Sequence, residues 1–520
     1  MSNNQARDQA LAARDAVRLE PTGLVTYRSA GKLLVLGDET ALTRCADLPD
    51  SIDVTPLASS GQAVEIDGFL GAFRVRLTDT GGNSISHAGD ALLDLHPQPL
   101  LGMAVTPPGY FHAPAMEWPA ELVDQLENLS GEFEKPKYFD YDASICAHSV
   151  NGQTVCRQCI DACPADAITG LGEQIEVNPN LCQGGGSCAT VCPSGAIRYL
   201  YPTLRDQGRR LRDMLRVYRE QGGEAPIVLF HGTSYSPQDY LDAHSNLLPL
   251  AVEELASVGM DLCLSALAYG AQQVVLLADT EVPQGSRASM AQQLGWLQAL
   301  LGGLGLDPGC VDLCQADAPL AEIEPGAVIE PAVHDVPADK RNAIYLALGH
   351  LAAQLRPAAD RVELPVPAPF GEIEIDAGKC TLCLACIGAC PGRALQDGSN
   401  REVPEVFFIE ANCLQCGACV QTCPEDAIEL SPRLLFDHDS RVRARSLNQD
   451  KPFACIACGK PFAPTSVIRK MQEKLRDHHM FSSERALDRL KMCEDCRVAD
   501  IVQDPDAMGG QFDPLKDFRR

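Results

Sequence analysis

Two runs of cysteine between residues 380 and 424 have the residue types and the spacing for redox chemistry. The first run reads CTLCLACIGACP and the second reads CLQCGACVQTCP, so both follow the pattern C-x2-C-x2-C-x3-C-P. Iron–sulfur clusters prefer thiolate ligands. In this pattern three cysteines ligate one 4Fe–4S cluster, and the cysteine before the proline ligates the neighbouring cluster. The two runs therefore predict a pair of 4Fe–4S clusters.

Cross-ligation divides these cysteines into two sets of four. We expect one cluster to be held by Cys380, Cys383, Cys386 and Cys423, and the other by Cys413, Cys416, Cys419 and Cys390. A zinc site or a disulfide framework would also use grouped cysteines. Two complete runs in register favour iron–sulfur clusters over both alternatives.

A second block of cysteines begins near Tyr141 and departs from the pattern twice. In its first run Cys156, Cys159 and Cys163 keep the spacing, but Cys146 stands earlier than the expected position, Gln153. We interpret this as a longer loop between the first and second ligands. In its second run, which contains Cys182, Cys188 and Cys192, the expected second ligand is replaced by Gly185.

Cross-ligation in this block predicts one complete and one incomplete site. The complete set is Cys146, Cys156, Cys159 and Cys192, and the incomplete set is Cys182, Cys188 and Cys163. The missing thiolate favours a 3Fe–4S cluster or an incomplete 4Fe–4S cluster, because the surrounding loop is otherwise intact. An empty site is the remaining alternative. His148 could ligate, although a second-shell or solvated role is the simpler interpretation.

Two further C-x2-C pairs lie near the C-terminus. FACIACGKPF carries Cys455 and Cys458, and KMCEDCR carries Cys493 and Cys496. Four thiolates in two such pairs predict a mononuclear metal site, for which zinc is the expected metal. A rubredoxin-like iron or another cluster are the alternatives.

The segment between the two cysteine blocks alternates strand and helix patterns. PIVLFHG and QQVVLLA read as buried strands, while Leu247 to Val258, LCLSALAYGA and residues 285–304 read as helices. This alternation predicts a parallel sheet flanked by helices. His231 stands at the end of a strand, where ligands gather in such sheets, but no partner residue converges on it in the sequence, so a structural role is favoured.

Composition limits the classes of partner. The chain has 520 residues, 23 cysteines and a formal net charge of −27. So acidic a protein is poorly suited to nucleic acid or to an anionic membrane surface. No run approaches the 18 or more apolar residues of a membrane span, and the N-terminus lacks a secretory pattern. We expect a cytoplasmic protein.

Several motifs resemble known families. Residues 141–202 and 370–432, which hold the two cysteine blocks, resemble bacterial dicluster ferredoxins. NLLPLAVEELASVGMDLCLSALAYGAQQVVLLA is similar to the iron-sulfur delta subunit of methyl-viologen-reducing hydrogenases, but Ala278 and its neighbours lack that family's 2Fe–2S cysteines. The whole arrangement, including ICAH, CRQCIDACP and CATVCPSGAI, resembles bacterial 4Fe–4S proteins that accompany formate dehydrogenases.

The resemblance implies electron transfer. We expect a multi-cluster protein that relays single electrons for a partner oxidoreductase, with formate dehydrogenase as the implied partner. The expected cofactors are three 4Fe–4S clusters, one 3Fe–4S or incomplete 4Fe–4S cluster, and zinc. The alternatives are a non-redox maturation factor for a partner enzyme, and an enzyme that uses the incomplete cluster as its substrate site.

The expected fold is a multidomain combination of α+β and α/β parts. Two ferredoxin-like modules flank an α/β parallel-sheet domain, and a small metal-knuckle domain follows. The expected divisions are a flexible N-terminus at 1–20, a small α/β domain at 21–105, a connector at 106–140, module 1 at 141–202, the α/β domain at 203–369, module 2 at 370–432 and a C-terminal domain at 433–520.

Overall fold

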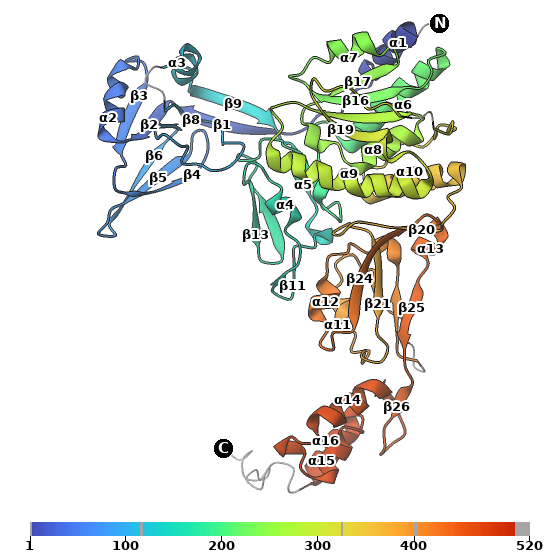
Figure 1. Ribbon diagram of the computed structural model, residues 1–520. Coiled ribbons are helices and arrows are strands. Elements are labelled where there is room, and N and C mark those ends of the chain that lie inside the picture. Colours follow the sequence, from blue (N-terminus) through green and yellow to red (C-terminus); the bar gives the residue numbers. More distant parts are fainter. Residues whose placement is uncertain (1–2, 115–117, 324–325, 400–402, 505–520) are drawn as a thin grey trace. The chain divides into compact units, whose positions relative to one another are not determined.

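The computed structural model describes residues 3–114, 118–323, 326–399 and 403–504. It separates the chain into two compact units, Met1–Val362 and Glu363–Arg520, and each is described by itself below (Figure 1). The sheets are small, and both parallel and antiparallel sheets occur. The expected mixture of α+β and α/β parts is therefore confirmed. Within the described ranges, no helix has the length and apolar character needed to cross a membrane.

The first unit begins with a docked helix and not with the predicted flexible terminus. Helix α1 (Asn3–Asp15) packs against α6 (Leu204–Glu220). Ala6 and Ala10 are fully buried, because small side chains one helical turn apart let the two helices approach closely. Arg7 Nη1 donates to the carbonyl oxygens of Leu241 and His244, both at 3.2 Å. The predicted flexible terminus was based on the polar composition of this segment, which gives no indication of these tertiary contacts.

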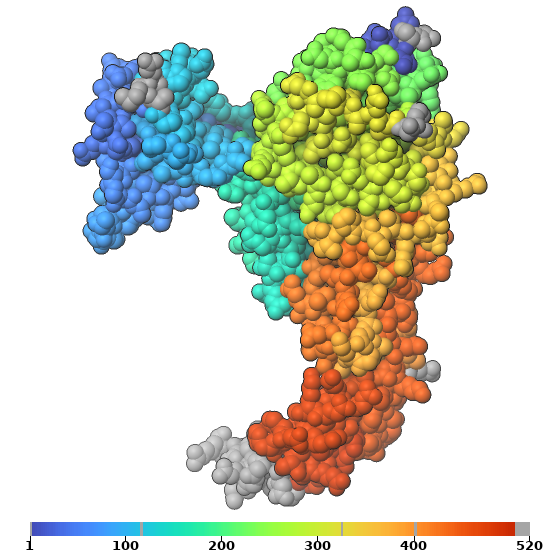
Figure 2. Space-filling view, viewed as in Figure 1, coloured from blue at the N-terminus to red at the C-terminus, as the bar shows by residue number. Residues whose placement is uncertain are grey.

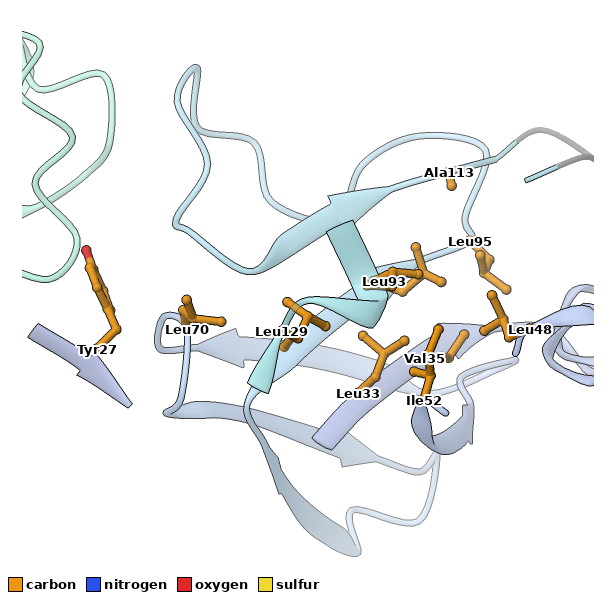
Figure 3. Packing of buried hydrophobic residues seen from close by; sticks show 12 residues of the cluster. Tyr27, Leu33, Val35, Leu48, Ile52, Leu70, Leu93, Leu95, Ala113 and Leu129 are labelled. Carbon is orange, nitrogen blue, oxygen red and sulfur yellow. The ribbon is translucent and has the colours of Figure 1, made fainter. Parts of the chain in front are cut away.

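The N-terminal domain is built on a parallel sheet in the order β3-β2-β7-β8. Alternate residues of its central strands face two different cores, as expected of a sheet covered on both faces. Leu33, Val35 and Leu93 face the helical side (Figure 3), while Leu34 and Leu36 face an antiparallel sheet of β4, β5 and β6. The strands and helices of this domain are β1 (Leu24–Ala30), β2 (Lys32–Gly37), α2 (Glu39–Leu42), β3 (Asp53–Ala58), β4 (Ala63–Asp67), β5 (Phe73–Thr78), β6 (Ser84–Gly89), β7 (Ala91–Asp94), β8 (Tyr110–His112) and α3 (Ala120–Glu127).

A buried polar chain joins the carboxyl ends of these parallel strands. The fully buried Asp94 carboxylate accepts a hydrogen bond from Tyr110 Oη at 2.6 Å and lies 2.7 Å from His96 Nδ1. His96 Nε2 lies 2.8 Å from Ser59 Oγ. The order of side chains is that of a hydrolytic triad. Ser59, however, is only 5% exposed and its hydroxyl donates to Gly37 O at 3.1 Å, so the chain braces the loops.

Residues 106–140, expected to be a connector, contribute strands to the domains on both sides. They contain β8 and α3, then β9 (Ser130–Pro136) and β10 (Phe139–Tyr141). Strand β9 pairs with β1 along its whole length, and β10 pairs with β15 (Ile197–Tyr199) at the end of module 1. The segment is rich in charge and proline, which led to its prediction as a connector. Its strands pair with partners far along the chain, and sequence periodicity gives no information on such partners.

Module 1 consists of short elements around its cysteine loops. They are η2 (Ala143–Ile145), β11 (Ser149–Val150), β12 (Gln153–Thr154), α4 (Gln158–Asp161), β13 (Ile168–Leu171), β14 (Gln174–Val177) and α5 (Ser187–Val191). The longer loop after Cys146 folds as the β11–β12 hairpin. Its turn residues Asn151 and Gly152 both have positive φ, which the tight hairpin turn requires.

The α/β domain has a four-stranded parallel sheet in the order β17-β16-β18-β19. Helix α8, whose described side chains are all buried, packs against α10. His231 is buried, and its Nδ1 lies 2.9 Å from Gly232 O, in keeping with the favoured structural role. The elements are β16 (Ile227–Gly232), α7 (Gln238–Ala243), β17 (Leu247–Val252), α8 (Met260–Ala268), β18 (Gln273–Ala278), α9 (Gln284–Leu304), β19 (Val311–Gln315) and α10 (Lys340–Leu355).

One predicted helix in this domain is wrong. Residues Leu247 to Val252 form strand β17, which pairs in parallel with β16, and only a short 3-10 turn, η3 (Leu255–Ser257), follows. A strand buried on both faces of a parallel sheet is apolar at almost every position. Its sequence therefore lacks the alternation that separates a strand from a buried helix.

The second unit holds module 2 and the C-terminal domain. Module 2 pairs β21 with β24 and places β23 between β22 and β25. Its elements are β20 (Arg361–Glu363), β21 (Gly371–Ile375), α11 (Ala385–Gly388), β22 (Leu395–Asp397), β23 (Glu405–Phe408), α12 (Ala418–Thr422), β24 (Ile428–Leu435), α13 (His438–Val442) and β25 (Arg445–Gln449). The C-terminal domain has β26 (Pro452–Ala454), β27 (Pro461–Pro464), α14 (Thr465–Leu475), α15 (Glu484–Arg489) and α16 (Glu494–Gln503), and residues 505–520 of its predicted range lie outside the described residues.

Candidate metal centres

Module 2 brings its cysteines together in two groups. Burial, and after it the thiols of Cys380, Cys383 and Cys423, raise the pKa of Cys386 to about 12. Burial also raises the pKa of Cys419 above its usual value, and after burial the thiols that add to this are those of Cys413, Cys416 and Cys390, followed by Cys386. The neighbours of Cys386 are those that cross-ligation predicts, whereas the neighbours of Cys419 include one cysteine of the other expected set. Burial thus disfavours free thiolates at these positions, and the iron of a bound cluster would supply the positive charge that offsets this cost.

The backbone of module 2 points hydrogen-bond donors at these sulfur atoms. Leu382 N–H donates to Cys380 Sγ at 3.4 Å, and Ala394 N–H donates to Cys390 Sγ at 3.3 Å. Ala427 N–H makes the same contact with Cys423 Sγ at 3.4 Å. Leu382 and Gln415 hold positive φ, a costly conformation for side chains of this size that tends to persist at functional sites. Such donors stabilise negative charge on cluster sulfur.

Module 1 gathers its complete set in the same manner. Burial, followed by the thiols of Cys192, Cys156 and Cys146, raises the pKa of Cys159 to about 12. His148 Nδ1 lies 2.8 Å from the carbonyl oxygen of Cys156, so the ring braces this loop. This contact agrees with the second-shell interpretation of His148.

The incomplete set lies around a loop of three glycines. Burial, then Cys182 and Cys163, raise the pKa of Cys188 well above its usual value. Gly185 occupies the position of the missing ligand, and a Cβ atom there would lie 2.9 Å from Pro164 Cγ. On its C-terminal side Gly186 has φ of +73°, and a Cβ atom would lie 2.6 Å from Ser257 N. The loop therefore packs tightly on both sides of the open position.

The cavity at the incomplete set is larger than the cavities at two complete sets. It has a volume of about 80 Å³, against about 20 Å³ at the Cys146 set and about 20 Å³ at the Cys413 set. Beyond the cysteine loop its walls include Tyr199, Glu254 and Glu281. Burial and neighbouring carboxylates raise the pKa of Glu254 to about 7, and Tyr199 Oη is buried without a hydrogen-bond partner. A water-sized site needs roughly 10–15 Å³, so the extra volume has room for a small ligand.

The four C-terminal cysteines meet at one point. Their sulfur atoms all lie within 4.8 Å of one another, and Cys458 Sγ is 3.7 Å from Cys493 Sγ. A tetrahedral zinc with Zn–S bonds of about 2.3 Å separates its sulfur atoms by roughly 3.8 Å. The four thiols and their spacing fit one metal ion. The sulfur atoms lie too close together to ligate the four separate irons of a cubane cluster. Helices α14 and α15 fill the long gap between the two C-x2-C pairs.

Sequence reasoning missed two lysines that touch module 1. Lys340, at the first turn of α10, donates from Nζ to Ala189 O and Thr190 O, both at 2.8 Å. Lys135, on β9, donates to Asn180 O at 2.8 Å and to Cys182 O at 2.6 Å. Neither residue lies within a cysteine block, so no local motif marks it. Only the tertiary fold brings them to the cysteine loops.

Comparison with known families agrees with the geometry of both modules. Residues 128–196 and residues 379–428 each match a family model described as a 4Fe-4S dicluster domain. A search of curated proteins found no similar sequence. The chain therefore carries two dicluster ferredoxin domains, which imply iron–sulfur clusters and an electron-transfer role.

Proposed function

We propose that this protein is a multi-cluster relay that passes single electrons between a partner oxidoreductase and an acceptor. The observation that carries the proposal is the presence of two 4Fe-4S dicluster domains, whose cysteines cross-ligation divides into four expected sets, three of them with four thiols. A cluster with four thiolate ligands has no open iron, so it suits electron transfer better than substrate chemistry. The proposed cofactors are three 4Fe–4S clusters and one 3Fe–4S or incomplete 4Fe–4S cluster.

The residues of the modules bind and tune these groups. When bound, a cluster supplies a site that gains and loses one electron. The cysteine loops hold it through thiolates, and the backbone N–H groups of Leu382, Ala394 and Ala427 stabilise charge on the sulfur ligands. The C-terminal set Cys455, Cys458, Cys493 and Cys496 holds a structural zinc in this proposal, since four protein thiolates leave no open position.

The partner in this proposal is an oxidoreductase with a basic docking surface. The net charge of −27 favours such a surface. Formate dehydrogenase is the partner that the motif resemblance indicates, and the α/β domain, similar in sequence to the hydrogenase delta subunit, acts as scaffold. The many thiols suit the reducing cytoplasm.

The test is electron paramagnetic resonance of anaerobically purified protein, oxidised and then reduced, with counts of iron, sulfide and zinc. We expect a 3Fe–4S signal after oxidation, several 4Fe–4S signals after reduction, and one zinc. Clusters that cannot be reduced, combined with tight binding to a cluster-free partner enzyme, would favour the maturation factor instead.

The larger cavity at Cys163, Cys182 and Cys188 favours a second candidate function, substrate binding at an open iron. Its walls include Tyr199 and Glu254, which line neither the cavity at the Cys146 set nor the cavity at the Cys413 set. Cyanide is a suitable probe, because it binds open iron. A change confined to the signal of this one cluster would support substrate binding at an open iron. Unchanged signals would contradict it and would favour the relay as the sole function.

A further inference from the structure

Lys340 is a half-buried cation that contacts the part of module 1 carrying Cys192. It lies on α10 of the α/β domain, 150 residues after Thr190, and its two hydrogen bonds end on consecutive carbonyls of α5. The next residue, Arg341, donates from Nη1 to Pro193 O at 3.1 Å. The α/β domain thus holds the backbone on both sides of Cys192 with charged donors. In Figure 2 the teal surface of module 1 adjoins the yellow-green surface of this domain.

Lys340 places its charge beside the loop that carries Cys192. Its two acceptors, Ala189 and Thr190, stand three and two residues before this cysteine. Asp261, which lines the same cavity as Lys340, carries the opposing carboxyl group. The ammonium therefore lies at the backbone of a cluster loop, where its charge would act on the cluster that the loop holds.

Lys135 repeats this arrangement at the incomplete set. It comes from the other side of module 1, on β9 of the N-terminal domain, and one of its two acceptors is the carbonyl of Cys182 itself. Its Nζ also lies 5.1 Å from the centre of the Tyr27 ring, whose hydroxyl donates to Asn180 O at 2.6 Å. Each neighbouring domain therefore inserts one lysine at one cysteine loop of module 1.

In module 2 a neutral side chain contacts a cysteine loop. The amide of Gln415 donates from Nε2 to Cys413 Sγ at 3.4 Å, whereas both lysines of module 1 donate to backbone carbonyl oxygens. Gln415 Nε2 also donates to Glu372 O at 2.8 Å, so the amide is held in place. The difference between a lysine and an amide is one full positive charge.

We propose that Lys340 and Lys135 are positioning residues that each raise the reduction potential of the cluster whose loop they hold, Lys340 for the Cys146 set and Lys135 for the Cys182 set. The inference rests on the proposed relay function. A reduced cluster carries one more negative charge than the oxidised one, and no bond is made or broken. A nearby fixed cation therefore stabilises the reduced form more than the oxidised form. Burial lowers the pKa of both lysines, whereas the neighbouring thiolates of Cys192 and Cys182 raise it. A bound anionic cluster would raise it more strongly.

The experiment is an anaerobic redox titration of the full chain, followed by electron paramagnetic resonance, for Lys340→Met and Lys135→Met. We expect Lys340→Met to lower the midpoint potential of the four-cysteine cluster of module 1, with a smaller change at the incomplete cluster. Lys135→Met should show the reverse order. The clusters of module 2 serve as the internal reference and should not shift. Unchanged midpoints in both variants, with all signals present, would overturn the inference.

Three further variants separate charge from packing. Lys340→Arg and Lys135→Arg retain the charge and should keep the midpoints near those of the unaltered protein. Asp261→Asn removes the opposing carboxylate, so it should raise the midpoint of the Cys146-set cluster, and a midpoint that stays or falls would count against the inference. These variants keep the test informative if a methionine variant fails to fold. A wild-type protein without reducible clusters would contradict the relay itself. That outcome differs from reducible clusters whose midpoint potentials do not depend on the two lysines, which would contradict only this inference.

Discussion

The two ferredoxin modules share one sequence pattern but lie in different surroundings. Module 2 has two complete thiol sets, and neutral donors contact its sulfur atoms. Module 1 lacks one ligand at Gly185, has a larger cavity there, and receives a lysine from each neighbouring domain. Two other domains of the same unit therefore contact the cysteine loops of module 1 with charged side chains. The difference indicates that the same sequence pattern can lie in a positively charged environment in one module and beside neutral donors in the other.

The largest expected effect is on module 2. Cys383→Ser removes a ligand of the Cys380 set, so one 4Fe–4S cluster should be lost or degraded. Iron and sulfide counts and the reduced spectra would measure the loss. Cys45→Ser, which alters a cysteine outside all the sets, is the control and should keep every cluster. Unchanged iron in Cys383→Ser would contradict the ligand set.

Gly185→Cys tests whether the open position is a ligand position. A thiol there should let the incomplete site hold an ordinary 4Fe–4S cluster, with a gain of up to one iron per chain and loss of the 3Fe–4S signal. The new Cβ atom would press on Pro164 Cγ at 2.9 Å. Gly185→Ala is the matched control, because it adds the same contact without the thiol. Equal iron in the two variants would show that the loop is not a cluster loop.

Cys493→Ser tests the metal centre outside both modules. Loss of one of four thiolates should remove the zinc and lower the thermal stability of the C-terminal domain, because the binding energy of a structural zinc contributes to folding. Zinc analysis and thermal unfolding would measure these effects. The spectra of both modules should be unchanged. A cluster signal that disappears in this variant would mean that the four thiols hold iron.

The smallest expected effect concerns Glu254 beside the larger cavity. Its folded pKa of about 7 lies above the ordinary value of 4.5, so the stability it contributes is full below about 4.5 and is lost as the pH rises towards 7. Glu254→Gln should flatten the dependence of the unfolding temperature on pH across this window. An exposed glutamate that does not act on Glu254 gives the control variant, Glu176→Gln, which should keep the slope. An unaltered slope in Glu254→Gln would indicate a solvated carboxylate.

The two dicluster domains could be predicted from the sequence because their cysteine pattern is local. The ligand sets stay a prediction, although the thiols that act on Cys386 are those of Cys380, Cys383 and Cys423, as spacing and cross-ligation predict. The α/β domain was predicted in outline for a similar reason, since the segments of α8 and α9 were each recognised as helices from their local sequence.

What the sequence did not reveal depends on contacts between distant residues. Strand β17 was mistaken for a helix, because burial on both faces removes the alternation of a strand. The docking of α1 and the strand pairing of β9 involve partners far along the chain. Lys340 is one of many charged residues in the sequence, and its role at the Cys192 loop follows only from the fold.

The separation of Lys340 from the loop that it holds has a consequence for biosynthesis. A ribosome adds roughly 5–20 residues per second, so the 150 residues from Thr190 to Lys340 take about 8–30 s to make. During this interval the module 1 loops have emerged, but the α/β domain that will cover them is unfinished. Delivery of a cluster to module 1 would have its easiest access in this period, before α9 packs against α5 and Lys340 binds the carbonyl oxygens of α5.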